Sequence, residues 1–327
     1  MDHAVEAEGL EREFKGGIRA VDGVDLAVSR GEVYGFLGPN GAGKSTTVRM
    51  LATLLRPTGG RARVAGRDVV AEAAAVRRSI GVALQDAAID PYMTGRELLH
   101  LQAVLHGFGR AVGRRRAVEL LERVDLEGAA DRRVGTYSGG MRRRLDLALA
   151  LVHEPEVLFL DEPTTGLDPI SRLTLWEEVR RLNADSGTTV FLTTQYLEEA
   201  DQLAGRVGII DGGRIVAEGS PAELKAQVGD PTLELALERP EEEVRAAEVM
   251  RRFGELQPSR DGHVVARLPG GASALPAVVR ALDEAAVVVT GLDLELPSLD
   301  DVFVAKTGRR LEAEGDDPTH SPAAAAT

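Results

Sequence analysis

The stretch from residue 38 to residue 46 constrains the fold of this chain more than any other. It fits the phosphate-binding pattern G-x-x-x-x-G-K-[ST] at every fixed position. In order, its residues are Gly38, Pro39, Asn40, Gly41, Ala42, Gly43, Lys44, Ser45 and Thr46. An apolar run at 32–37 predicts a buried strand before the loop, and the spacing from residue 47 predicts a helix after it. Since the pattern requires this order of strand, loop and helix, we predict a nucleotide-binding site rather than a chance glycine-rich turn.

The residue types of this loop suit phosphate chemistry. Glycines allow backbone N–H groups to approach phosphate oxygens, and the start of the following helix adds positive potential. Lys44 can reach the outer phosphates of a nucleotide, and the hydroxyl of Ser45 can bind Mg²⁺. The loop therefore indicates a nucleoside triphosphatase without indicating which one.

Further apolar runs indicate that the strand before the loop belongs to a larger sheet. Runs at 80–84, 155–161 and 188–194 alternate with segments of helical spacing. This alternation predicts an α/β fold with a mainly parallel sheet, whose ligand groups lie at the carboxyl ends of the strands. Between residues 10 and 29, apolar and polar residues alternate, which predicts a flanking antiparallel layer.

Two adjacent carboxylates, Asp161 and Glu162, follow the apolar run at 155–161. Asp161 is placed to hold Mg²⁺, directly or through water. Glu162 could polarise the attacking water, because phosphoryl transfer depends mainly on positioning and charge compensation. The alternative is an acidic strand end that faces solvent.

A third motif has Ser138, Gly139 and Gly140 as its core. Together, the three motifs make residues 10–224 resemble the ATP-binding subunit of ATP-binding cassette (ABC) transporters, in which this core is the signature motif. The resemblance implies a P-loop NTPase domain at 1–228, with a RecA-like core and a helical subdomain at about 86–152. In that family two such domains dimerise head to tail, so that each ATP lies between one phosphate loop and the signature motif of the opposite subunit. Because the chain carries one set of motifs, the resemblance implies a homodimer.

The same resemblance assigns further site residues. Gln85 resembles the Q-loop residue that senses magnesium, and Asp168 resembles the D-loop residue. ATP and Mg²⁺ are the implied cofactors, with Ser45, Gln85 and Asp161 as the metal ligands. Phe14 fits the aromatic ring that stacks on the base, although an ordinary core ring is an equally open interpretation.

The chain departs from the family pattern in the signature and in the switch. Tyr137 and Met141 replace the usual Leu and Gln, and Gln195 stands where the family normally has a His. An amide can donate a hydrogen bond to a γ-phosphate, but it cannot become a cation. We therefore expect catalysis by Glu162, Lys44 and Gln195, with a polar residue at a helix N-terminus as the alternative for Gln195.

Two other patterns have simple structural explanations. The arginine run at 142–144 is typical of a solvated helix face, and the alternative is that one of these arginines supports the dimer or a phosphate. In the predicted helical subdomain, the stripe of Leu98, Leu101 and Leu105 is more typical of core than of a contact surface for a membrane subunit.

The sequence after residue 228 predicts a small α+β accessory domain at 229–311, followed by a disordered tail at 312–327. Residues 294–308 resemble the C-terminal motif of the daunorubicin-resistance type of ATP-binding subunits. Those proteins export antibiotics and related lipophilic compounds with a separate permease. The resemblance implies drug export through an integral membrane permease subunit. Packing of the last helix through Leu299, Val302 and Phe303 would account for the motif equally well.

Composition limits the partners that we expect. The chain has no Cys, which excludes disulfides and thiolate metal sites. Its formal net charge of −13 opposes nucleic-acid binding, and it has no apolar run long enough to span a membrane. We expect a location at the cytoplasmic face of the cell membrane, through the permease. The alternatives are an ABC-type ATPase acting on nucleic acid or the ribosome, a dimerisation module without hydrolysis, and export of a lipid or polysaccharide.

Overall fold

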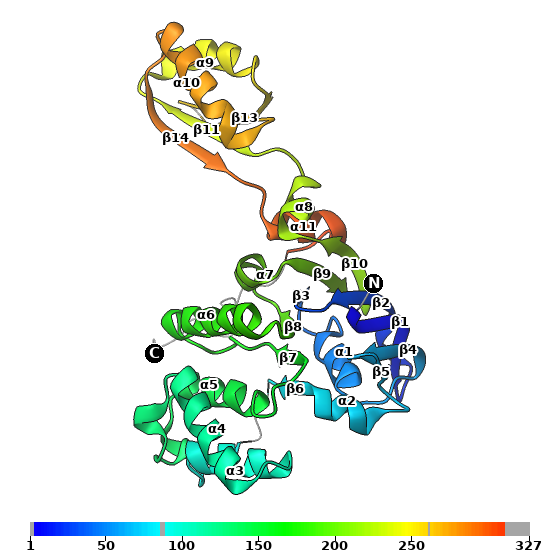
Figure 1. Cartoon of the computed structure of the whole chain (residues 1–327). Coiled ribbons are helices and arrows are strands. Elements are labelled where there is room, and N and C mark those ends of the chain that lie inside the picture. Colours follow the sequence, from blue (N-terminus) through cyan, green and yellow to red (C-terminus); the bar gives the residue numbers. More distant parts are fainter. Residues whose placement is uncertain (1–2, 86–88, 261, 311–327) are drawn as a thin grey trace, which may run out of the picture. The chain divides into compact units, whose positions relative to one another are not determined.

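The computed structural model describes residues 3–85, 89–260 and 262–310, which form two compact units (Figure 1). The first unit extends to residue 221, and the second runs from residue 222 to residue 310. The domain boundary that the sequence suggests, between residues 228 and 229, lies slightly later in the chain and stays a prediction. The expected tail at 312–327 lies outside the described residues.

A six-stranded sheet forms the centre of the first unit, in the order β10-β9-β3-β8-β7-β6. Its neighbouring strands are parallel, except that β10 pairs antiparallel with β9. The strands are β3 (Val33–Leu37), β6 (Ile80–Ala83), β7 (Val157–Asp161), β8 (Thr189–Thr194), β9 (Arg206–Asp211) and β10 (Arg214–Gly219). Every residue of β7 and β8 is buried, as expected for central strands covered on both faces. The predicted α/β fold is confirmed.

A four-stranded antiparallel sheet, in the order β2-β1-β4-β5, flanks this centre. Its strands are β1 (His3–Phe14), β2 (Ile18–Ser29), β4 (Gly59–Val64) and β5 (Arg67–Asp68). Leu10 and Val24 from this sheet share one buried cluster with Phe36 of β3 and Val48 of the helix that follows the phosphate loop. The predicted antiparallel layer is therefore confirmed, and it packs directly beside the strand that leads into the loop.

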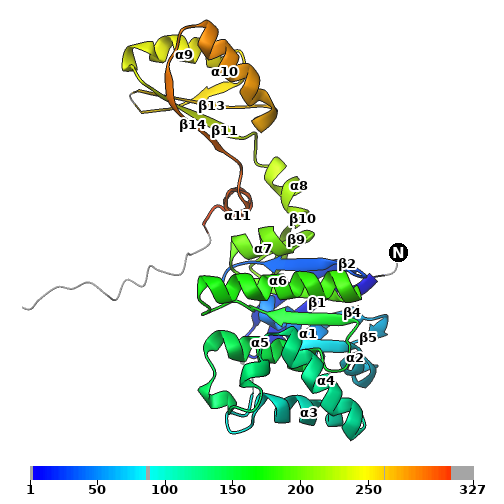
Figure 2. The same ribbon diagram turned by 60° about the vertical axis from the view of Figure 1, so that its left-hand side comes forward.

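Helices complete the first unit. They are α1 (Lys44–Leu51), α2 (Ala73–Ser79), α3 (Gly95–Leu105), α4 (Arg110–Arg123), α5 (Gly139–Ala150), α6 (Pro169–Ser186) and α7 (Leu197–Leu203), with 3-10 turns η1 (Glu127–Ala129) and η2 (Val134–Thr136). In both views α3, α4 and α5 lie together at one end of the unit (Figure 1, Figure 2). Thr94 and Glu97 form a capping box at the start of α3, which explains why this helix begins at Gly95.

The leucine stripe on α3 is only partly core. Leu98 is buried, whereas Leu101 is 44% exposed and Leu105 is 72% exposed. The expectation that the whole stripe packs inward is therefore wrong for Leu101 and Leu105. The inner face of α3 is formed instead by Leu98, Leu99 and Ala103, which belong to the core of the helical group.

The second unit contains a four-stranded antiparallel sheet in the order β12-β13-β11-β14. Its elements are α8 (Pro221–Ala226), β11 (Thr232–Leu237), η3 (Pro240–Glu242), α9 (Glu243–Met250), β12 (Glu255–Gln257), β13 (His263–Arg267), η4 (Gly271–Ala274), α10 (Leu275–Glu284), β14 (Val289–Glu295) and α11 (Leu299–Thr307). The succession from β11 to β14 is the split β-α-β topology of ferredoxin-like folds. Leu233 and Leu235 of β11 pack with Val278 and Leu282 of α10 in a separate core.

The last helix, α11, carries the motif that resembles the drug-resistance subfamily. Ser298 and Asp301 form a capping box at its start. Leu299, Val302 and Phe303 are buried, so packing does fix this part of the motif. In the part of the chain that the structure describes, we find no helix with the length and apolar character needed to cross a membrane.

Candidate functional site

The phosphate loop joins the carboxyl end of β3 to α1. Gly43 has a φ of 108°, and a Cβ at this position would lie 2.3 Å from the carbonyl oxygen of Ala20. A Cβ on Gly38 would lie 2.3 Å from the carbonyl oxygen of Ile210. These two glycines are therefore required by close backbone approach, and at Gly43 also by the left-handed conformation. Between them, Asn40 and Gly41 are exposed at the tip of the loop.

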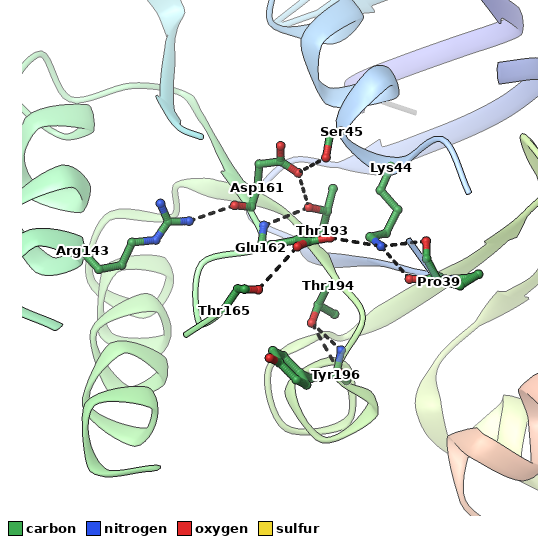
Figure 3. Close-up of polar contacts among 11 residues, drawn as sticks. Pro39, Lys44, Ser45, Arg143, Asp161, Glu162, Thr165, Thr193, Thr194 and Tyr196 are labelled. Carbon is green, nitrogen blue, oxygen red and sulfur yellow. Dashed lines mark hydrogen bonds and ion pairs between the residues drawn. The ribbon is translucent and has the colours of Figure 1, made fainter. Parts of the chain in front are cut away.

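Lys44 lies buried between the loop and the acidic strand end (Figure 3). Its Nζ donates hydrogen bonds to the carbonyl oxygens of Gly38, at 2.6 Å, and Pro39, at 3.0 Å. The same Nζ lies 3.2 Å from Oε1 of Glu162. Burial lowers the pKa of the Lys44 ammonium, while Glu162 and Asp161 oppose that shift. The structure thus brings the predicted lysine and the predicted base into direct contact.

Asp161 ends β7 and is fully buried. Its Oδ1 accepts hydrogen bonds from Ser45 Oγ, at 3.0 Å, and from Thr193 Oγ1, at 2.6 Å. Among the described residues, no hydrogen-bond partner reaches its Oδ2, although that atom is buried. Buried polar atoms are normally satisfied, so a free carboxylate oxygen beside a serine hydroxyl is a donor set that fits a hard cation such as Mg²⁺.

Glu162 follows Asp161 with a φ of 48°, a left-handed conformation that is uncommon for residues other than glycine. Its N–H donates to both the carbonyl oxygen and the Oγ1 of Thr193, at 3.1 and 3.0 Å. Thr165 Oγ1 donates to Glu162 Oε2 at 3.4 Å. The strained backbone is therefore held by a neighbouring strand, and the side chain points toward Lys44 (Figure 3).

Sequence reasoning missed Thr193 and misjudged the arginine run. Thr193 is opposite Asp161 in the parallel pairing of β7 with β8, a register that the sequence alone does not give. The side chain of Arg143 is only 11% exposed, and that of Arg144 is 19% exposed. The solvated-face interpretation is therefore wrong for Arg143 and Arg144, and it holds for Arg142, which is exposed.

The signature segment begins α5. Ser138 caps this helix by accepting a hydrogen bond from the N–H of Met141, and both Ser138 and Gly139 are exposed. Gly140 is buried, and a Cβ there would lie 2.6 Å from Oγ of Ser171. The variant Tyr137 is buried in the helical group, where its hydroxyl donates to the carbonyl oxygen of Ala129 at 2.7 Å.

The remaining predicted residues lie outside the hydrogen-bonded cluster around Lys44 and Asp161. Phe14, at the end of β1, is 39% exposed, Gln85 is exposed after β6, and Gln195 is partly exposed after β8. Asp168 caps α6, and hydrogen bonds from the hydroxyl and N–H of Ser171 lower the pKa of its carboxyl group. In the described ranges, no hydrogen bond joins these four residues to that cluster.

Comparison with known proteins identifies the family. The profile of ABC transporters matches residues 21–165, and the profile of the C-terminal domain of ATP-binding proteins like DrrA1-3 matches residues 219–307. The chain is 50% identical to the daunorubicin resistance ATP-binding protein DrrA2 of Streptomyces coeruleorubidus, over 95% of its own length and 97% of the relative's. It is 49% identical to the daunorubicin/doxorubicin resistance ATP-binding protein DrrA of Streptomyces peucetius, over 93% and 92% of the two lengths.

Solved structures agree with this assignment. The structure of cbiO1 from Clostridium perfringens, part of an ABC transporter complex, matches with a TM-score of 0.64 and 28% identity, over 69% of this chain and 92% of that one. The dimeric ATP-binding cassette MJ0796 bound to ADP and Pi matches with a TM-score of 0.62 and 27% identity, over 66% and 98%. The chain therefore belongs to the ATP-hydrolysing subunits of the ABC transporter family, and within it to the daunorubicin/doxorubicin resistance type of ATP-binding proteins.

Proposed function

We propose that the chain hydrolyses ATP with Mg²⁺ to energise the export of a lipophilic drug through a separate membrane permease. The observation that carries this proposal is the cluster in which Lys44, Ser45, Asp161 and Glu162 meet (Figure 3). It unites the groups that phosphoryl transfer needs, namely a cation for the outer phosphates, oxygen ligands for a metal and a carboxylate for the reacting water.

Ser45 and Asp161 are the residues that would hold the metal. The hydroxyl of Ser45 and the free Oδ2 of Asp161 come from two different elements, α1 and β7, and Gln85 would add an amide oxygen from the segment after β6. When bound there, Mg²⁺ would offset the negative charge of the outer phosphates. The donor set contains only oxygens, which is the preference of Mg²⁺.

Lys44 and Glu162 would each exchange a partner when ATP binds. Phosphate oxygens would replace the carbonyl oxygens of Gly38 and Pro39 as acceptors for the Lys44 ammonium. Glu162, released from Lys44, would accept a hydrogen bond from the attacking water and orient it toward the γ-phosphate. The Gln195 amide would donate to the γ-phosphate as a neutral group.

A second copy of the chain would complete the site. The exposed Ser138 and Gly139 form the N-terminal end of α5, where backbone N–H groups and a hydroxyl can meet an anion. In a homodimer these groups would close on the ATP bound to the phosphate loop of the partner, with Asp168 in the same contact. A related cassette is dimeric, which supports a dimer of this chain.

The names of the relatives support drug export as the task of this ATPase. Proteins that match both units of the chain are named for daunorubicin or doxorubicin resistance. The net charge of −13 favours this role over an action on nucleic acid. We place the subunit at the cytoplasmic face of the cell membrane, bound to its permease.

Co-expression with a candidate permease from the genomic neighbourhood tests the proposal. Membranes that contain the permease should retain the chain, and a lipophilic antibiotic should change its ATPase rate. The Lys44→Ala variant is the control, because it should be retained by the same membranes without ATPase activity. An ATPase that neither binds these membranes nor responds to the drug would contradict drug export while leaving the hydrolytic site in place.

A further inference from the structure

One arginine of the signature helix contacts the backbone around Glu162. Arg143 lies on α5, and its guanidinium donates to the carbonyl oxygens of Asp161, at 2.9 Å, Pro163, at 2.8 Å, and Leu84, at 2.7 Å. Figure 3 shows the side chain reaching from its helix toward the end of β7. Three carbonyl oxygens from two separate segments thus converge on one guanidinium.

The positions of these carbonyl groups are informative. Asp161 and Pro163 are the neighbours of Glu162 in the chain, so Arg143 binds the backbone on both sides of the proposed base. Glu162 is the residue with the left-handed φ of 48°, a conformation that persists only where its surroundings hold it. Leu84 immediately precedes Gln85, so the same guanidinium also holds the start of the segment that would reach the metal.

Asp146 fixes the orientation of this guanidinium. It lies one turn further along α5, and its Oδ2 is 3.1 Å from Nη1 of Arg143. Both side chains are nearly buried, with 11% and 12% of their surfaces exposed. The planar fork of arginine can donate to several acceptors in fixed directions, which lysine cannot reproduce. The buried pair therefore makes the contact with the Glu162 segment geometrically specific.

We propose that Arg143 is a positioning residue that couples the signature helix to the base Glu162 and to the segment before Gln85. This inference rests on the proposed function, in which α5 contacts ATP bound to the partner. A shift of α5 on that contact is transmitted by Arg143 to the two peptide groups that flank Glu162. The rate of the chemical step thus depends on how the signature helix is seated.

Arg144 provides a matched control on the same helix. Its guanidinium also donates to backbone carbonyl groups, those of Val124 and Asp125, but these residues follow α4 in the helical group. Replacing Arg144 therefore removes a comparable set of hydrogen bonds from α5 but leaves the contacts of the segment around Glu162 unchanged. A difference between the two arginine variants separates positioning of Glu162 from general support of the helix.

The experiment measures ATP hydrolysis by the full chain in the wild type, Arg143→Met, Arg143→Lys and Arg144→Met. We expect Arg143→Met to lower kcat about 10- to 100-fold, the scale of a misplacement of about 1 Å, with the KM for ATP changed less than about threefold. Arg143→Lys should recover only part of the loss, because it restores the charge but not the fork. Arg144→Met should keep kcat within about threefold of the wild type.

A double substitution tests whether Arg143 acts through Glu162. In single-turnover measurements, Arg143→Met should add little to the loss already caused by Glu162→Gln, because effects that pass through one group are not additive. Additive losses, equal losses in the two arginine variants, or an unchanged kcat in folded Arg143→Met would each overturn the inference. A wild-type chain without ATPase activity, or an active Glu162→Gln variant, would instead contradict the proposed function. If Arg143→Met does not fold, Arg143→Lys decides alone. A lowered kcat with a nearly unchanged KM for ATP supports the inference, and an unchanged kcat overturns it.

Discussion

Lys44 Nζ lies 3.2 Å from Glu162 Oε1, and the two side chains are only 3% and 6% exposed. The phosphate-binding cation and the proposed base are thus partners in a buried ion pair. A base held by a cation is a poor acceptor for a water proton, so the pair must separate before hydrolysis. In the proposed mechanism the phosphates of ATP cause that separation, because they offer Lys44 a stronger anionic partner.

Replacing the proposed base by its amide should separate binding from hydrolysis. Glu162→Gln keeps the size of the side chain but removes its negative charge, so Lys44 remains available to phosphate oxygens. We expect ATP binding to be retained, turnover to fall by at least about 100-fold and an ATP-bound dimer to accumulate, as size-exclusion chromatography with ATP can measure. Glu248→Gln, an exposed position on α9, is the control. Hydrolysis by Glu162→Gln near the wild-type rate would show that another group activates water.

Breaking the buried pair from the lysine side should destabilise the first unit. Lys44→Met leaves the Glu162 carboxylate buried without its cation, which costs about 3–5 kcal/mol in comparable pairs. The double variant Lys44→Met/Glu162→Gln should regain most of that stability. Urea unfolding followed by the fluorescence of Trp176, the single tryptophan, measures both values. A double variant no more stable than Lys44→Met would mean that the pair contributes little.

The motifs of the site could be predicted because each is contiguous in the sequence and its chemistry fixes the residue types. The phosphate loop and the Asp161-Glu162 pair are of this kind, and the strand, loop and helix around them follow from the apolar pattern. Their meeting also follows from a general rule, since the carboxyl ends of neighbouring parallel strands share one edge of the sheet.

Other features depend on register and burial, which no local pattern encodes. Thr193 holds Asp161 only because β8 pairs with β7 in one particular register. Arg143 belongs to a run of three arginines that local patterning assigns to solvent. In the folded chain, however, α5 is oriented so that Arg143 faces carbonyl groups from elsewhere in the sequence. The strand order of the second unit likewise arises from tertiary packing rather than from the order of its elements.

Asp146 should make stability depend on pH in an unusual direction. Burial raises the pKa of its carboxyl group from 3.8 to about 6, although Arg143 opposes the shift. Between these two pH values, the Asp146 carboxyl group holds more protons in the folded chain than in the unfolded chain. Its stabilising contribution therefore falls as the pH rises from about 4 to about 6, and it is constant above that range.

A difference measurement isolates this effect from other titrating groups. The stability of the wild type minus that of Asp146→Asn should fall by about 2 kcal/mol between pH 4 and pH 7 in urea unfolding. Asp185→Asn is the control for the substitution itself, because the Asp185 side chain is 63% exposed. A difference for Asp146 that stays constant or rises with pH would contradict the raised pKa.

Phe14 should contribute to ATP affinity rather than to the fold. Its ring is 39% exposed at the end of β1, with the guanidinium of Arg12 over one face, 4.7 Å from the ring centre. A ring this exposed adds little to the core, whereas stacking of an aromatic ring on a base contributes about 1–3 kcal/mol. Phe14→Ala should therefore raise the KM for ATP about tenfold with little change in melting temperature, and Phe14→Trp should restore the wild-type KM.

The control is Ile18→Ala, since Ile18 pairs with Phe14 across the β1–β2 hairpin and is 64% exposed. Equal effects of the two alanine variants on KM would assign the loss to the hairpin, and an unchanged KM in Phe14→Ala would remove Phe14 from the site.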